Sequence, residues 1–178
     1  VSVFTINQFT SGATEFLIPY GNELIELLYK KLTNKKFKSR KYNEFIDCIV
    51  ALIGEIQRNI LKDNFPIDIF LKPCLSNMPA KEDRSSNLDM MRFYLWLGSK
   101  TNFQPIEDFG KVAILLLCQP IEDIGGIAED DSGILQNVIK ILIEILKQIE
   151  NPQNFIAMIC DEDNFKVQRV LDTINNYI

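Results

Sequence analysis

FLIPYGNELIELLYKKL (residues 16–32) is followed in this chain by KYNEFIDCIVALIGEIQRNI (41–60), and then by FPIDIFLKPCLSNMP (65–79) and SSNLDMMRFYLWLG (85–98). Apolar residues in these segments recur at the three- and four-residue spacing of helices that bury one face. The segments therefore predict two consecutive helix pairs, with a short polar break after each. A helix pair that repeats about every 40 residues is typical of an α-solenoid, in which each pair packs on its neighbours.

The rest of the chain continues this pattern, so the predicted fold class is all-α, an α-solenoid of about four antiparallel helix pairs. Residues 98–104 break the helical spacing, and the acidic, Gly-rich segment 120–132 (PIEDIGGIAEDDS) is expected to be a long loop or a mobile insert. Nothing in the sequence indicates a β-hairpin. We expect a single array over residues 1–178, with pairs at roughly 14–61, 66–98, 105–149 and 151–178.

The composition is that of a folded, acidic chain. It has 178 residues, a formal net charge of −5 and a hydrophobic fraction of 47%, which is enough for a core and excludes a disordered chain. The negative charge argues against direct binding of nucleic acid, because phosphate binding needs a concentrated basic surface. One basic run is interpreted as a helix C-terminus followed by a solvated turn: Lys30, Lys31, Lys35, Lys36, Lys38, Arg40 and Lys41.

The sequence offers no group of residues for catalysis, for a metal or for a cofactor. There is no histidine, which excludes Ser-His-Asp and Cys-His arrangements and the usual zinc sites. The carboxylates of the acidic segments lie in expected loops without an apolar frame to shift a pKa. We therefore expect a protein that is not an enzyme. Four widely spaced cysteines in apolar runs are interpreted as small buried hydrophobes in a reducing compartment: Cys48, Cys74, Cys118 and Cys160.

No run of 18 or more apolar residues occurs, so a membrane-spanning helix is not expected. The first residues also lack a signal-peptide pattern and an initiator Met, which suggests a fragment of a longer protein. If the second helix of each pair forms the inner wall of the solenoid, its polar face is the candidate surface for protein binding. The candidates on the helices at 41–61 and 85–97 are Glu44, Asp47, Glu55, Arg58, Asp89 and Arg92. The alternative for this face is simple solvation.

Several segments resemble the C-terminal HEAT repeats of the importin-β (karyopherin) superfamily. FLIPYGNELIELLYKKLTN is similar to a first repeat helix of the form FLPY-xx-ELLPLLLKLL, and Asn43 and residues 51–53 match the helix that follows it. The segment FLKPCLSNMPAKED resembles the family pattern LSYLPLKED, through Leu75-Ser76, Met78-Pro79 and residues 81–83. DSGILQNVIKILIEILKQ and FKVQRVLDTINNYI are similar to the closing helices. Two departures are Tyr42, where the family has Asp, and a longer segment over 105–132.

The resemblance implies a HEAT-repeat segment of a nuclear transport receptor that shuttles between cytoplasm and nucleus. Its partners would be protein cargo, with the small GTPase Ran and the nucleoporins engaged through the full-length receptor. An acidic lining would suit basic cargo such as localisation signals or histones. Three alternatives stay open: a HEAT scaffold subunit of another complex, a compact helical bundle of unrelated function, and an enzyme. In the bundle, the first and last helices would touch.

Overall fold

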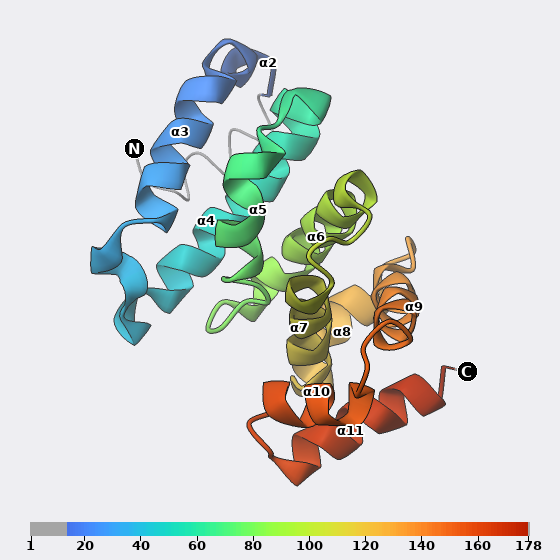
Figure 1. Cartoon of the computed structure of the whole chain (residues 1–178). Coiled ribbons are helices and arrows are strands. Elements are labelled where there is room, and N and C mark those ends of the chain that lie inside the picture. The colour runs from blue at the N-terminus through green and yellow to red at the C-terminus, as the bar shows by residue number, and fades with distance from the viewer. Residues whose placement is uncertain (1–13, 178) are drawn as a thin grey trace. The chain divides into compact units, whose positions relative to one another are not determined.

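The computed structural model describes residues 14–177, and every regular element in that range is a helix (Figure 1). This confirms the predicted all-α class. The expectation that residues 1–13 end a preceding helix or form a frayed start lies outside the described residues. The elements are α2 (Thr14–Leu17), η1 (Ile18–Tyr20), α3 (Gly21–Leu32), η2 (Lys35–Lys38), η3 (Arg40–Tyr42), α4 (Asn43–Ile56), η4 (Gln57–Leu61), η5 (Lys62–Asn64), α5 (Ile67–Leu75), η6 (Arg84–Ser86), α6 (Asn87–Thr101), α7 (Ile106–Leu117), α8 (Ile121–Ala128), α9 (Ile134–Leu146), α10 (Pro152–Ile159) and α11 (Asn164–Asn175).

The chain divides into two compact units, one ending at Leu97 and the other beginning at Gly98. In the first unit the chain leaves α3, turns through two short 3₁₀ helices and returns along α3 as α4 (Figure 1). Each helix buries the apolar stripe that its spacing predicts. The buried stripe of α3 is Ile25, Leu28 and Leu32, and that of α4 includes Ile46, Ile49, Val50, Ile53 and Ile56.

Aromatic side chains connect α5 to α6 in the first unit. Phe65, just before α5, contacts Phe70 of α5 with ring centroids 5.0 Å apart, and Phe93 of α6 at 5.4 Å. Met90, Met91 and Tyr94 of α6 are fully buried, so the methionines and aromatics of this helix pack in the core. The ring contacts of Phe65 place the middle of α6 beside α5.

The second unit is built around α7, which contacts α9, α10 and α11, while α8 packs on α9. The apolar character of α7 on all sides predicts this central position. Its buried residues are Phe109, Gly110, Val112, Ala113, Ile114, Leu116 and Leu117. Thus the helices of residues 105–149 and those of residues 151–178 share one interior.

Two expected interruptions are helical in the structure. The pattern break expected from Gly98 is wrong in its first part, since α6 continues to Thr101. A Cβ atom at Gly98 would lie 2.0 Å from Cε1 of Phe103, so the bare backbone at this position admits the Phe103 ring against the helix. The Phe103 N–H also donates to the Gly98 carbonyl at 3.0 Å.

The expectation of a long loop over residues 120–132 is also wrong, because it contains α8. Ile124 and Ile127, three residues apart, are buried against the rest of the second unit. This burial offsets the poor helix propensity of the Gly-Gly pair between them. Glu122 and Asp123 in the first turn add a favourable interaction with the helix dipole.

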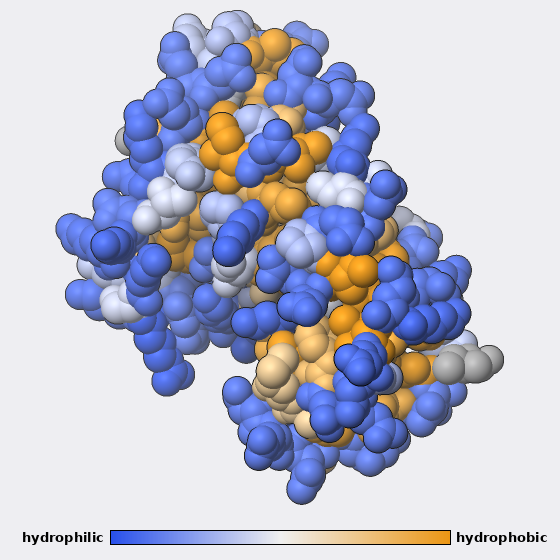
Figure 2. All heavy atoms as spheres, viewed as in Figure 1, coloured by the Kyte–Doolittle hydropathy of each residue, from blue (hydrophilic) through white to orange (hydrophobic). Residues whose placement is uncertain are grey.

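Hydrophilic side chains cover most of the face drawn in Figure 2, and groups of apolar side chains show between them. No helix within residues 14–177 is long and apolar enough to cross a membrane. Of the four cysteines, Cys74 and Cys160 are buried as expected, whereas Cys48 and Cys118 are only partly so. The large apolar side chains that stay exposed are Phe16, Ile18, Tyr20, Leu27, Ile69, Met158 and Phe165.

Candidate functional site

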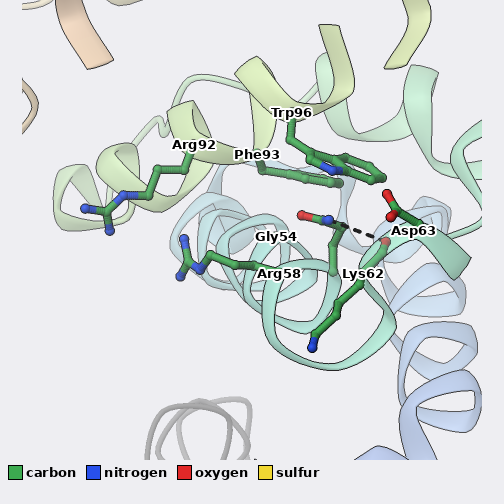
Figure 3. A pocket seen from close by; sticks show the side chains of 8 residues that line it. Gly54, Arg58, Lys62, Asp63, Arg92, Phe93 and Trp96 are labelled. Carbon is green, nitrogen blue, oxygen red and sulfur yellow. Dashed lines mark hydrogen bonds between the residues drawn. The ribbon is translucent and has the colours of Figure 1, made fainter. Parts of the chain in front are cut away.

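A pocket of about 360 Å³ lies in the first unit, where the end of α4 and the helical turns after it face α6 (Figure 3). Three cationic side chains and one carboxylate line it together with two aromatic rings. The lining residues are Gly54, Gln57, Arg58, Lys62, Asp63, Arg92, Phe93 and Trp96.

Two local features of α4 shape this pocket. At Gly54 the helix has no side chain, and an added Cβ would lie 2.8 Å from Cβ of Phe93, so α6 can approach α4 closely there. After Ile56 the helix widens into a π-helical turn, η4, and Lys62 then takes a positive φ of 50°. Such wide turns are frequent at functional sites. The Gln57 side chain donates to the Lys62 carbonyl at 3.5 Å and holds this turn (Figure 3).

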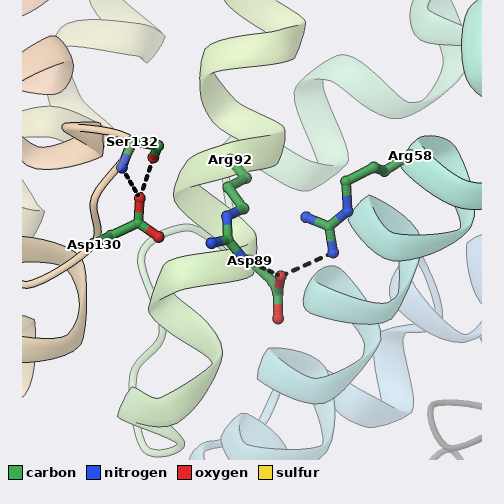
Figure 4. Close-up of polar contacts among 5 residues, drawn as sticks. All are labelled: Arg58, Asp89, Arg92, Asp130 and Ser132. Carbon is green, nitrogen blue, oxygen red and sulfur yellow. Dashed lines mark hydrogen bonds and ion pairs between the residues drawn. The ribbon is translucent and has the colours of Figure 1, made fainter. Parts of the chain in front are cut away.

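The cationic side of the pocket is organised by one carboxylate. Asp89 Oδ1 on α6 accepts from Arg58 Nη2 at 3.1 Å and lies 3.5 Å from Arg92 Nη1 (Figure 4). The side chains of Arg58 and Arg92 are 40% and 39% exposed, so solvent screens these pairs and each stabilises the fold by less than about 1 kcal/mol. The main effect of these ion pairs is on side-chain position, because Asp89 holds the guanidinium groups of Arg58 and Arg92 beside each other.

Phe93 and Trp96 form the aromatic side of the pocket. Their ring planes are 17° apart with centroids separated by 6.1 Å, and Trp96 also meets Phe65 edge-on. Figure 3 shows the two rings lying over the pocket, with Arg58 and Lys62 on the opposite side. Guanidinium groups bind carboxylates through paired N–H donors, and aromatic faces pack against apolar side chains. The arrangement therefore suits a ligand that carries both carboxylates and apolar groups.

The structure brings together three of the six residues expected on the protein-binding face: Arg58, Asp89 and Arg92. Glu44 is exposed and Glu55 partly exposed, both on α4 and both outside the pocket lining. Sequence reasoning missed the contribution of Gly54, Gln57, Lys62, Asp63 and Trp96. Gly54, a lone glycine within the apolar run IVALIGEI, was the one local signal of a close helix approach.

The placement of Asp47 on an exposed polar face, as a candidate for protein binding, is wrong, because its side chain is fully buried. Its Oδ2 atom accepts three backbone N–H groups in succession, from Lys81 at 2.9 Å, Glu82 at 2.7 Å and Asp83 at 3.0 Å. Asp47 therefore anchors the loop between α5 and α6, and it is withdrawn from any binding surface. The other oxygen, Oδ1, is buried without a hydrogen-bond partner.

The same loop has further anchors on its α6 side. Asn87 is buried and its Oδ1 accepts from the Ala80 N–H at 2.9 Å, while the Ser86 hydroxyl donates to Asp83 at 2.7 Å. Burial acts to raise the pKa of the Asp83 carboxyl, but hydrogen bonds led by those from Ser85 and Ser86 together outweigh it and leave that pKa below its usual value. These contacts hold α6, and with it the pocket wall, against α4.

Asp47 should make stability depend on pH with an unusual sign. Burial raises the pKa of the Asp47 carboxyl above its ordinary value, and the three backbone donors only partly offset this. A carboxyl whose pKa is raised by folding stabilises the protein most below the unfolded-state pKa, about 4, and loses this contribution as pH rises through the folded-state pKa.

The asparagine side chain of the Asp47→Asn variant does not titrate, so this variant serves as the reference. The unfolding free energy of the wild type, relative to Asp47→Asn, should therefore rise when pH is lowered from 7 to 4, as measured by urea denaturation. A fall over this range would contradict the prediction, because it would show that the backbone donors dominate.

No family model, no curated protein and no solved structure matches this chain. Within residues 14–177 there is also no cluster of three or more residues with the chemistry to hold a metal ion. The comparisons with known proteins therefore lend no support to the resemblance between residues 16–32 or 70–83 and importin-β receptors.

Proposed function

We propose that this chain is a protein-binding segment of a helical-repeat scaffold, and that its α4–α6 pocket receives an acidic, partly apolar segment of a partner protein. The observation that carries the proposal is local charge. Three cationic side chains, Arg58, Lys62 and Arg92, outnumber the one carboxylate in the pocket lining, although the formal net charge of the chain is −5. A cationic pocket on an acidic protein selects for negatively charged partners and rejects positively charged ones.

This proposal reverses the charge of the partner expected from the sequence. The expectation of basic cargo depended on an acidic lining that included Asp47 and Asp89. Asp47 is buried beneath a loop, and Asp89 is engaged by two arginines. Of the acidic residues expected on that face, Glu44 and Glu55 remain, away from the pocket. The face that carries the pocket thus favours an acidic partner.

The cationic and the aromatic groups of the pocket have different roles in this binding. Arg58 and Arg92, held side by side by Asp89, present N–H donors to carboxylates of the partner, and Lys62 adds a point charge. Trp96 and Phe93 provide the apolar surface that excludes water around those contacts. The energy of binding comes from charged hydrogen bonds formed in a partly desolvated recess.

Trp96 is the only tryptophan in the chain, so its fluorescence reports on this pocket directly. A synthetic peptide of alternating glutamate and leucine should change that fluorescence saturably, and more weakly as the salt concentration rises. The same peptide with lysine in place of glutamate should have no effect. Saturable binding of the lysine peptide alone would overturn the proposed partner and restore the expectation of basic cargo.

Substitutions around Asp89 should change the affinity in opposite directions. Arg58→Gln and Arg92→Gln each remove charged hydrogen bonds and should weaken binding of the glutamate–leucine peptide about tenfold, as followed by Trp96 fluorescence. Asp89→Asn removes the carboxylate that competes for both guanidinium groups, so it should tighten binding severalfold. Lys72→Gln, an exposed substitution on α5 outside the pocket, is the matched control and should leave the affinity unchanged. Equal affinities in all four variants would place the peptide elsewhere.

The more specific role that we propose, a segment of a nuclear transport receptor that shuttles between nucleus and cytoplasm, depends on the resemblance of residues 16–32 and 70–83 to importin-β repeats. In a solenoid of this kind, small rotations between repeats accumulate, and partners that favour different curvatures displace one another. The full-length protein should then associate with nucleoporin repeats and with the GTP form of Ran in pull-down experiments. Peptide binding without either association would favour a HEAT scaffold of another complex.

A further inference from the structure

Two cysteines of the second unit lie with their sulfur atoms in contact. Cys118 follows the last residue of α7 and Cys160 follows the last residue of α10, and their Sγ atoms are 3.3 Å apart. A disulfide bond is about 2.05 Å long, so the sulfurs need to approach by only roughly 1.2 Å. The sequence shows nothing of this, because 42 residues separate the two positions and no CxxC motif is present.

The backbone around both cysteines is held in place. The Cys118 N–H donates to the Ile114 carbonyl at 2.9 Å, and the Cys160 N–H donates to the Ile156 carbonyl at 3.0 Å. From α11, Arg169 Nη1 donates to the Cys118 carbonyl at 3.0 Å. Hydrogen bonds from three helices therefore hold the backbone on either side of this pair of thiols.

We propose that Cys118 and Cys160 are a site of reversible oxidation, at which a disulfide bond links the C-terminal ends of α7 and α10. The oxidant is a small-molecule disulfide. The Cys118 thiolate attacks one sulfur of the oxidant and expels a thiolate, which leaves a mixed disulfide on Cys118. The Cys160 thiolate then attacks the Cys118 sulfur and expels the second thiolate. Two protein thiols thus lose two electrons and two protons, and the oxidant is reduced to two thiols.

The order of attack follows from exposure. Cys160 is 1% exposed, whereas Cys118 is partly exposed and can be reached by a small oxidant. Burial, reinforced by the contact with Cys160, raises the pKa of the Cys118 thiol to about 12, while the charges of Lys166 and Arg169 act in the opposite direction. Because the thiolate is the reactive form, oxidation should be slow at neutral pH and should become faster as the pH is raised.

The two other cysteines are internal controls within the first unit. Cys74 is completely buried, and burial raises its pKa strongly. Cys48 donates its S–H to Asp83 Oδ2 at 3.6 Å, and burial together with the Asp83 charge raises its pKa to about 11. Both are held as thiols in surroundings that favour the neutral form.

The disulfide would constrain the unfolded chain more than the folded one. It closes a loop of about 40 residues, for which the loss of unfolded-state entropy lowers the unfolding equilibrium constant on the order of a thousandfold. Because α7 is the central helix of the second unit, fixing its end to α10 stabilises the whole packing around it. Oxidation should therefore shift the urea midpoint of the chain upward.

The experiment treats the folded 178-residue chain with oxidised glutathione at pH 8.5, followed by intact mass measurement, then alkylation and peptide mapping. We expect a loss of 2 Da, about the mass of two hydrogens, one peptide pair joined through Cys118 and Cys160, and full reversal by dithiothreitol. Cys118→Ser and Cys160→Ser should each abolish the loss, and the variant carrying Cys48→Ser and Cys74→Ala should retain it. A lasting glutathione adduct on Cys118, a disulfide mapped to any other pair, or four unreacted thiols after prolonged treatment would each overturn the proposal.

A second measurement keeps the test independent of folding defects in the variants. The urea midpoint of the oxidised wild type is compared with that of the same sample after reduction, so no substitution is involved. We expect the oxidised form to unfold at the higher urea concentration. If the urea midpoint of the oxidised form were equal to or lower than that of the reduced form, the disulfide bond would strain the fold. That result would contradict the proposal that the native packing accommodates this bond.

Discussion

Asp47→Ala is expected to lower the free energy of unfolding by about 3 kcal/mol at pH 7. The substitution removes the acceptor of three backbone N–H groups in the loop between α5 and α6. A buried donor that loses its partner costs about 1–3 kcal/mol, and the partial exposure of this loop puts each one near the lower limit. The loop also positions the start of α6, so its release should loosen the pocket wall. Urea denaturation followed by Trp96 fluorescence measures the loss in the unit where it occurs.

Two further substitutions on α4 serve as comparisons for Asp47→Ala. Asp47→Asn keeps the shape and one oxygen acceptor but loses the charge, so it should cost less than half as much as Asp47→Ala. Glu44→Ala, one turn earlier and exposed, should change the unfolding free energy by less than about 0.5 kcal/mol. If Asp47→Ala behaved like Glu44→Ala, the hydrogen bonds to the loop would contribute nothing to stability.

The second large effect is expected from Gly54→Val, at about 3 kcal/mol of destabilisation. A Cβ atom at this position would lie 2.8 Å from Cβ of Phe93 and 3.2 Å from its Cγ, and these atoms lie too near the α6 backbone to rotate away. The helices must therefore separate, which removes buried contacts of Phe93 and opens the pocket beside Trp96. Far-UV circular dichroism in urea gives the stability, and binding of the glutamate–leucine peptide should be lost in parallel.

Gly126→Val is the matched control for this prediction. No atom lies within 4 Å of the position that a Cβ would occupy at Gly126, which is exposed on α8. The same chemical change should therefore alter stability there by less than about 0.5 kcal/mol. A similar loss for both variants would show that valine is poorly tolerated in these helices generally, and not that Gly54 is required for close packing.

The helices themselves were largely predictable, and the reason is local. The spacing of apolar residues over 21–32, 43–56 and 134–146 predicts amphipathic helices, and the structure has helices there. Two predicted breaks were wrong, because Gly98 and the Gly-Gly pair of α8 are residues that usually indicate a loop. Tertiary contacts override these weak propensities when a ring packs on the bare backbone or when isoleucines become buried.

The candidate site was predictable only as a list of polar positions. Helical spacing placed Arg58 and Asp89 on polar faces of their own helices, but their ion pair spans 31 residues and depends on how α4 meets α6. Asp47 and Glu44 have the same local sequence pattern, but Asp47 is buried and Glu44 is exposed. The difference arises because a loop more than 30 residues later in the chain folds over Asp47. Trp96 lies in the apolar run MMRFYLWL, and nothing in that local pattern indicates that it forms one wall of a pocket.

The sequence alone determined that the chain is helical, where most of its helices lie and which residues are apolar enough to be buried. Periodicity encodes these properties, because each helix places its side chains by its own geometry. Only the tertiary structure decided that Asp47 is buried, that two arginines share one carboxylate and that two distant thiols touch. These outcomes depend on contacts between residues 31 to 42 positions apart, and pairings at that distance leave no local pattern in the sequence.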